Sequence, residues 1–170
     1  MGTDQIAHRN GTLLEHLKGV WNLLNEWRNP EPVCLAGLCH SLYSTGGFEQ
    51  QLIPLSNRDE IKNLIGEEAE RLVYLFCACD RPLTHPGIGR DEPMKFHDRF
   101  TDKDYLLEYK EWCALCEIML ANELDLGHHD PAFYHKHLDH YTDLFGRFKP
   151  WLSDSAIKAN HDFKETGLKA

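Results

Sequence analysis

Long apolar runs are missing from this chain of 170 residues. No stretch approaches the roughly 20 consecutive apolar residues that a membrane-spanning helix needs. Met1 is followed by Gly2, Thr3 and Asp4 rather than by a basic and then apolar leader segment. We therefore expect a cytoplasmic protein without a membrane partner.

Positive charge is also scarce. Lys and Arg total 18 against 27 Asp and Glu, which gives a formal net charge of -9. Such a balance repels phosphate backbones unless a local basic patch overrides it. The sequence also lacks the interleaved aromatic and basic residues that nucleic-acid binders use. Nucleic acid is therefore not expected as a partner.

Familiar catalytic signatures are absent as well. The sequence has neither a nucleophile-elbow serine nor a phosphate-binding loop. Its one CxxC pair lies in an apolar helical pattern, without the second pair that a zinc knuckle requires. All the cysteines lie within apolar runs, which favours reduced core thiols over a disulfide framework; they are Cys34, Cys39, Cys77, Cys79, Cys113 and Cys116.

What the chain does contain is apolar residues at helical spacing. Its length and its 42% hydrophobic content predict one all-α domain over residues 1–170, with about six to seven helices. Gly, Pro and potential capping residues punctuate the pattern. The expected helices span about 12–27, 32–43, 59–64, 67–79, 101–126 and 131–148, followed by a last short helix that starts at Ser153 and frays before Ala170.

One segment, about 80–100, is predicted to be a long irregular loop. It contains Pro82, Pro86, Gly87, Gly89 and Pro93, which interrupt regular elements. Long loops in small domains are often lids or binding loops, although a plain surface excursion fits equally well. The segment carries several basic or titratable residues, namely His85, Arg90, Lys95, His97 and Arg99.

Two histidines stand out on the first two expected helices. His16 lies on the first helix, and the apolar second helix ends in Cys34-Leu-Ala-Gly-Leu-Cys-His40-Ser41-Leu-Tyr43. A histidine followed by an apolar helix that ends in His-Asp is how the signature of the HD metal-dependent hydrolase superfamily begins. The chain resembles this superfamily, with Ser41 at the position of the aspartate.

The resemblance continues through the expected fifth helix. The segment 58–73 is similar to the helices that follow the His-Asp motif in the guanosine tetraphosphate hydrolase branch. The later run Ile118-Met-Leu-Ala-Asn122-Glu-Leu-Asp125 resembles the helix that supplies the final metal-binding aspartate. In this chain that position is Asn122.

The resemblance implies a metal site made by His16, His40, Ser41 and Asn122. Both acidic positions are neutral here, so we expect weaker binding of the divalent Fe, Mn or Zn ion that such a site would take. A bound ion would activate water for attack on a phosphoester, or bind oxygen as in the family's oxygenase branch. The resemblance thus implies a metal-assisted hydrolase or oxygenase.

Other interpretations stay open at this point. The correspondence can be shifted by one helix, which would make Asp80 the surviving acid. In a metal-free descendant, a histidine serves as acid or base, or the domain only binds a ligand or a protein. The two histidines can also be core residues satisfied by local hydrogen bonds.

We predict a small-molecule pocket around the two histidines, and the oligomeric state is left open. The predicted catalytic residues are His40, His16 and Asp80. Ligand-binding candidates are Ser41, Tyr43, Arg81, Asn122 and His8, which lies two helical turns before His16 and fits a pocket rim.

A second group of histidines lies around the start of the expected sixth helix. His137 and His140 share a face at a spacing that can chelate zinc, but no acid or cysteine completes the site. A solvated helix start explains the group as well. Its members are His128, His129, His135, His137 and His140.

Overall fold

The computed structural model of the chain describes residues 2–8 and 10–167, and within these ranges it is predominantly helical. The predicted all-α class is confirmed. The described residues form nine α-helices: α1 Leu13–Glu26, α2 Glu31–Cys39, α3 Arg58–Ile65, α4 Glu67–Ala78, α5 Arg81–Thr84, α6 Tyr109–His129, α7 Pro131–Lys136, α8 Leu138–Phe148 and α9 Asp154–Asp162. Two antiparallel hairpins accompany them, β1 Ala7–His8 with β2 Gly11–Thr12, and β3 Phe96–Asp98 with β4 Lys103–Tyr105.

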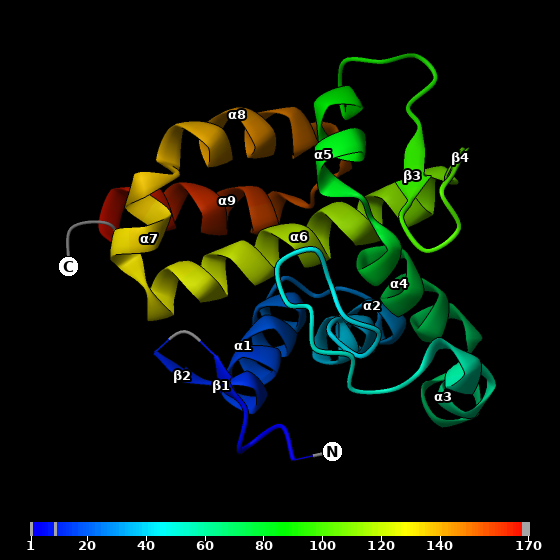
Figure 1. Cartoon of the computed structure of the whole chain (residues 1–170). Helices are drawn as coiled ribbons and strands as arrows, with labels where there is room; N and C mark the ends of the chain where they lie inside the picture. The colour runs from blue at the N-terminus through cyan, green and yellow to red at the C-terminus, as the bar shows by residue number, and fades with distance from the viewer. Residues whose placement is uncertain (1, 9, 168–170) are drawn as a thin grey trace.

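Helix α6 is the central element (Figure 1). It packs against α1, α2 and α4 on one side and against α7 and α9 on the other. Most of its residues from Trp112 to Gly127 are buried, including polar ones. Polar side chains in the middle of α6 therefore face neighbouring helices rather than solvent.

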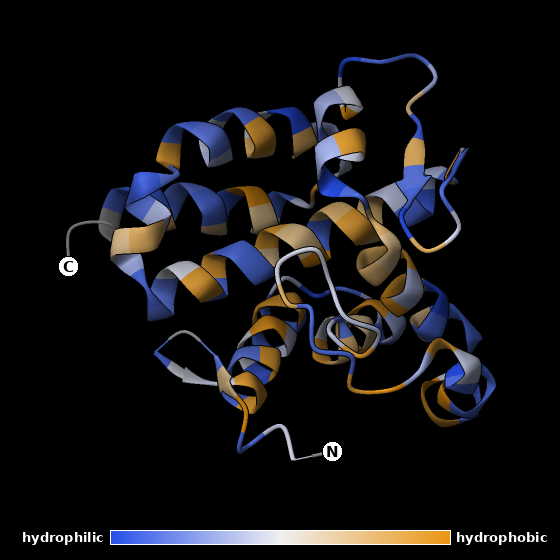
Figure 2. Ribbon diagram, in the orientation of Figure 1, coloured by the Kyte–Doolittle hydropathy of each residue, from blue (hydrophilic) through white to orange (hydrophobic). Residues whose placement is uncertain are grey.

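The apolar faces of the helices meet around α6, as the hydropathy colouring of Figure 2 shows. Helix α2 crosses α1 closely at Gly37, where an added Cβ would lie only 2.2 Å from Leu24 Cδ1. This close approach brings His40, the residue after α2, to the buried face of α1.

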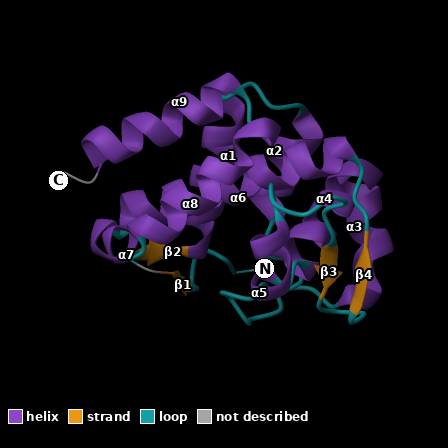
Figure 3. Cartoon of the chain, turned by 90° about the horizontal axis from the view of Figure 1, so that it is seen from above, coloured by secondary structure: helices purple, strands orange, loops and turns teal. Residues whose placement is uncertain are grey.

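Helix α1 begins where the sequence predicts. The Thr12 side chain accepts a hydrogen bond from the Glu15 N–H, and the Glu15 carboxylate accepts one from the Thr12 N–H. The hairpin β1–β2 before it was not predicted. Figures 1 and 3 place it beside the junction of α6 and α7, where Asn10 Nδ2 donates to the His129 carbonyl.

The prediction of a long irregular loop over 80–100 is wrong in part. Asp80 caps the short helix α5, a 3-10 turn His85–Gly87 follows, and β3 then pairs with β4.

The predicted helix start at Thr101 is also wrong. Asp98 accepts hydrogen bonds from the Phe100 and Thr101 N–H groups, which closes a hairpin turn there. Helix α6 begins at Tyr109 instead.

The helix expected over 131–148 is divided. Its two parts, α7 and α8, meet at His137, whose φ of -109 and ψ of 14 lie outside the helical range.

The last helix begins as predicted, because the Ser153 side chain accepts a hydrogen bond from the Ala156 N–H. The fraying expected before Ala170 lies outside the described residues.

Two further expectations concern thiols and membranes. All six cysteines lie in described segments and are free thiols, and Cys34, Cys77, Cys79 and Cys116 are buried. Burial raises the pKa of the Cys39 thiol to about 11. Within residues 2–8 and 10–167, no helix has both the length and the apolar character needed to cross a membrane.

Candidate functional site

The structure brings together three side chains that the sequence places on separate helices. His16 comes from α1, His40 follows α2, and Asn122 comes from α6. The Nε2 atom of His16 lies 3.2 Å from His40 Nε2 and 3.1 Å from Asn122 Oδ1. All three residues are buried.

The hydrogen bonds of the remaining ring nitrogens determine where the imidazole protons lie. His16 Nδ1 is 2.7 Å from Asp125 Oδ2, and His40 Nδ1 is 2.7 Å from the Gly37 carbonyl oxygen. A carboxylate and a carbonyl can only accept, so each Nδ1 is the donor. Neutral imidazoles bonded in this way present the lone pairs of both Nε2 atoms to each other.

The third group adds another acceptor. Asn122 Nδ2 donates to Glu123 Oε1 at 3.0 Å, which directs the amide oxygen toward His16. Three lone pairs therefore converge at the centre of the site, with no hydrogen between them as long as both rings are neutral. This arrangement is satisfied either by one added proton or by a cation.

His40 is held in its neutral form. Burial, followed by the positive charge of a protonated His16, lowers the pKa of His40 from 6.5 to about 3. At neutral pH, His40 is therefore an acceptor through Nε2. Its Nε2 lone pair can therefore serve as a metal ligand, and the ring does not carry charge into the core.

A small pocket of about 190 Å³ opens onto this cluster. The ring of His8 lies against that of His16, with centroids 4.7 Å apart, and so covers the buried pair from the N-terminal side. Predicted site residues in the lining are His8, His16, His40, Ser41, Arg81 and Asn122; the rest are Thr45, Gly47, Phe48, Glu123, Leu126, Phe133 and Tyr141.

Two predicted site residues point elsewhere. The Tyr43 hydroxyl donates to Glu70 Oε1 at 3.0 Å, and burial raises its pKa well above the usual range. Asp80 does not line the pocket; its carboxylate accepts the Leu83 N–H and caps α5. The structure thus does not bring Asp80 to the histidines, because a helix start takes up its carboxylate.

The sequence interpretation missed Asp125 as a partner of His16. Asp125 follows Asn122 by three residues, so both lie on the face of α6 that meets α1. A second signal is Gly19 in the middle of α1, where an added Cβ would lie 1.7 Å from Asp125 Oδ1. The carboxylate thus lies against α1 in space that only glycine leaves open.

The donor set suits one kind of metal. Bonds of about 2.1 Å at a tetrahedral centre place two nitrogens about 3.4 Å apart, close to the observed 3.2 Å between His16 and His40 Nε2. Imidazole favours Zn and Fe, whereas Mg and Ca require carboxylates. Among the described residues, no group of three or more His, Cys, Asp or Glu side chains is placed to hold a metal. A site here therefore depends on the amide oxygen of Asn122.

The second histidine group does not form a cluster of its own. His129 Nε2 lies 3.8 Å from Asp125 Oδ2, behind His16, and the His128 ring contacts Phe163 edge-on. His137 and His140 line a different groove next to the pocket.

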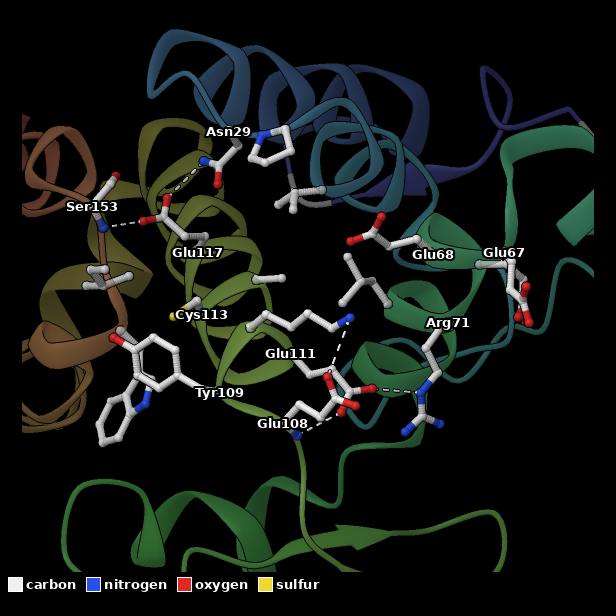
Figure 4. Close-up of a pocket in the computed structure, with 18 of the residues that line it drawn as sticks. Asn29, Glu67, Glu68, Arg71, Glu108, Tyr109, Glu111, Cys113, Glu117 and Ser153 are labelled. Carbon is white, nitrogen blue, oxygen red and sulfur yellow. Dashed lines mark hydrogen bonds and ion pairs between the residues drawn. The ribbon is translucent and has the colours of Figure 1, made fainter.

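A larger groove, of about 830 Å³, lies between α2, α4 and the first half of α6 (Figure 4). Its charged groups are largely engaged with one another. Arg71 Nε donates to Glu111 Oε1, and buried Glu117 accepts from Asn29 Nδ2 and from the Ser153 N–H. The groove is more spacious than the two-histidine pocket, but several of its charged groups are paired with one another.

Residues 1–81 match a domain family described as a domain of unknown function (DUF6817). The matched segment contains His16, His40 and Ser41 but ends before Asn122 and Asp125. No curated protein and no solved structure matches the chain.

Proposed function

We propose that this chain is an HD-like enzyme that binds one divalent transition metal, Zn, Fe or Mn, in the two-histidine pocket and hydrolyses a small polar substrate. The observation that carries the proposal is the convergence of three acceptors, His16 Nε2, His40 Nε2 and Asn122 Oδ1. Such a set of lone pairs needs a positive partner. A bound metal would supply an activated water for attack on an ester bond.

The surrounding hydrogen bonds support this assignment. Metal-binding histidines usually donate their second ring N–H to a carboxylate or a carbonyl, which fixes the ring and raises its basicity. His16 does so to Asp125 and His40 does so to Gly37. Asp125 also supplies the negative charge that the replaced acidic positions, Ser41 and Asn122, do not.

The chain's own residues have separate roles in this proposal. His16, His40 and Asn122 hold the ion, while Asp125 keeps the His16 ring in place. Ser41 is buried in the pocket wall and offers a hydroxyl to the substrate. Arg81, at the pocket mouth, offers positive charge to an anionic substrate.

One observation favours a metal-free alternative. The buried pair His16–Asp125, 2.7 Å apart, can hold an extra proton on His16, which then donates to His40 or Asn122. In that case His16 serves as the acid or base without a metal, or the pocket only binds its ligand. The free thiols favour the reducing cytoplasm as the setting of either version.

Metal content separates the two versions. The protein is purified without a histidine tag and its bound metals are measured by elemental analysis, beside His40→Ala and the control His128→Ala. We expect about one equivalent of Zn, Fe or Mn in the wild type and the control, and a loss of at least about tenfold in His40→Ala.

The result that would contradict the metal-assisted version is equally clear. A folded wild-type protein without stoichiometric metal, even after incubation with Zn, Fe or Mn salts, contradicts it. Equal metal content in the wild type and His40→Ala would place the metal elsewhere.

A further inference from the structure

A second groove, of about 540 Å³, adjoins the two-histidine pocket. The two share four lining residues, namely Arg81, Glu123, Phe133 and Tyr141. The groove thus continues the pocket outward, between α5 with its following turn and α8. A ligand longer than the pocket can extend into this groove.

The lining of the groove has one more cationic than anionic side chain, although the chain as a whole is acidic. The three arginines Arg81, Arg90 and Arg147 are ion-paired with the two carboxylates of Glu123 and Asp143, so Asp143 is shared by two of them. It also holds three histidines, namely His85, His137 and His140. Pro82, Phe133, Tyr141 and Leu144 give it an apolar wall.

The fold therefore joins two sequence features that were otherwise unexplained. His85 and Arg90 belong to the segment 80–100, and His137 and His140 belong to the histidine group before and within α8. These features lie some fifty residues apart in the chain, yet they line one groove.

We propose that this groove binds the anionic group, a phosphate or a carboxylate, of an aromatic or aliphatic ligand whose other end enters the two-histidine pocket. The proposal deepens the proposed function, on which it rests for the identity of that ligand as the substrate. Anion binding in the groove itself does not require a metal.

Arg81 is the best-placed anion-binding residue. It lines both the groove and the pocket, and its ion pair with Glu123, Nη1 to Oε1, is long at 3.4 Å. A loosely held guanidinium can turn toward a phosphate or carboxylate and bind it with two parallel hydrogen bonds. Arg147, by contrast, is held by the carbonyls of His85 and Ile88 and shapes the groove wall.

His85 lies among the groove's positive charges. Its Nε2 atom is buried and has no hydrogen-bond partner among residues 2–8 and 10–167, although His85 is part of the groove lining. Burial and then the positive charges of Arg81, His140 and Arg147 lower the pKa of His85 to about 3. An anion in the groove would offset these charges.

The test uses three probes that share one ring, namely benzylphosphonate, benzoate and neutral benzyl alcohol. Binding is followed at constant ionic strength by the histidine ring signals in NMR spectra. We expect saturable binding of at least one anion, with shifts at His85, His137 and His140, and no saturable binding of benzyl alcohol. Whichever anion binds tighter decides between phosphate and carboxylate.

Matched arginine variants locate the site. Arg81→Gln should weaken anion binding at least about fivefold, because a charge-assisted contact is lost. Arg71→Gln, at an arginine of the groove in Figure 4 that is also ion-paired to a glutamate, should leave binding unchanged. If Arg81→Gln does not fold, Arg90→Gln replaces it, since Arg90 is more exposed.

Three results would overturn the proposal: no saturable anion binding, equal weakening by Arg71→Gln, or shifts confined to His16 and His40. The His40→Ala variant separates this proposal from the metal site. Anion binding that persists in His40→Ala supports the groove whether or not the wild type binds a metal, and loss of anion binding there contradicts it.

Discussion

Gly19 leaves the space in which Asp125 accepts the hydrogen bond of the His16 ring. Alanine usually stabilises a helix interior by about 1 kcal/mol relative to glycine. At Gly19 the added Cβ would lie 1.7 Å from Asp125 Oδ1, so the carboxylate must move away from His16. We expect Gly19→Ala to destabilise the fold by about 2 kcal/mol in urea denaturation, as overpacking does, and to weaken metal binding.

Gly146 provides the matched control. It also lies within a helix, α8, but an added Cβ there meets no atom within 4 Å. Gly146→Ala should therefore be neutral or stabilising by up to about 1 kcal/mol. If Gly19→Ala were as stable as Gly146→Ala, the close contact between Asp125 and α1 would be disproved.

His85 makes stability depend on pH. Its folded pKa of about 3 lies below the usual 6.5, so between these values the unfolded chain binds the extra proton. The free energy of unfolding must therefore fall as the pH is lowered from 6.5 toward 3. His85→Gln removes this term, and we expect the wild type to lose about 1 to 2 kcal/mol more than the variant between pH 7 and 5.

This difference is measured by urea denaturation of both proteins at each pH. The buried His40 is present in both proteins, so its own contribution cancels. Equal pH profiles for wild type and His85→Gln would contradict a neutral, buried His85.

At the scale of elements, α3 and α4 are joined by an ion pair whose carboxylate is fully buried. Glu70 is 0% exposed and accepts from Arg58 Nε, from Arg58 Nη2 and from the Tyr43 hydroxyl. Glu70→Ala leaves the buried Tyr43 hydroxyl and the partly exposed Arg58 without this partner and should cost about 3 kcal/mol in urea denaturation. The more exposed pair of Arg71 with Glu111 provides the comparison, and Arg71→Ala should cost under about 1 kcal/mol.

A similar loss in both variants would contradict this account of the α3–α4 contact. It would mean that burial does not distinguish the two ion pairs. The comparison uses the same measurement for both, so errors of extrapolation to zero urea largely cancel.

Helix positions that depend on local signals were predictable from the sequence. The caps at Thr12 and Ser153 mark their helix starts through hydrogen bonds within one turn. The start of α6 was not predictable in this way. Thr101 was expected to cap the helix, but its N–H donates to the carboxylate of Asp98 in a hairpin turn. Pairing between β3 and β4 overrides the local preference.

At the scale of the whole molecule, the site joins residues that are far apart in sequence. The resemblance to a known motif indicated His16, His40 and Asn122, which the fold brings together. The sequence did not indicate that Asp125 bonds His16 or that Glu123 accepts from Asn122. Both contacts depend on how α6 is rotated against α1 and α5. Asp80 was misplaced for a related reason, since the sequence did not show the helix α5 that it caps.

In the proposed function, His16, His40 and Asn122 together hold one metal ion. Asn122→Asp would place a carboxylate beside the two imidazoles, so the most direct measurement is the dissociation constant for Co2+ of this variant against the wild type. We predict binding at least about tenfold tighter in Asn122→Asp, with no gain in the control Asn63→Asp at an exposed position of α3. An unchanged constant in Asn122→Asp would contradict a shared metal site.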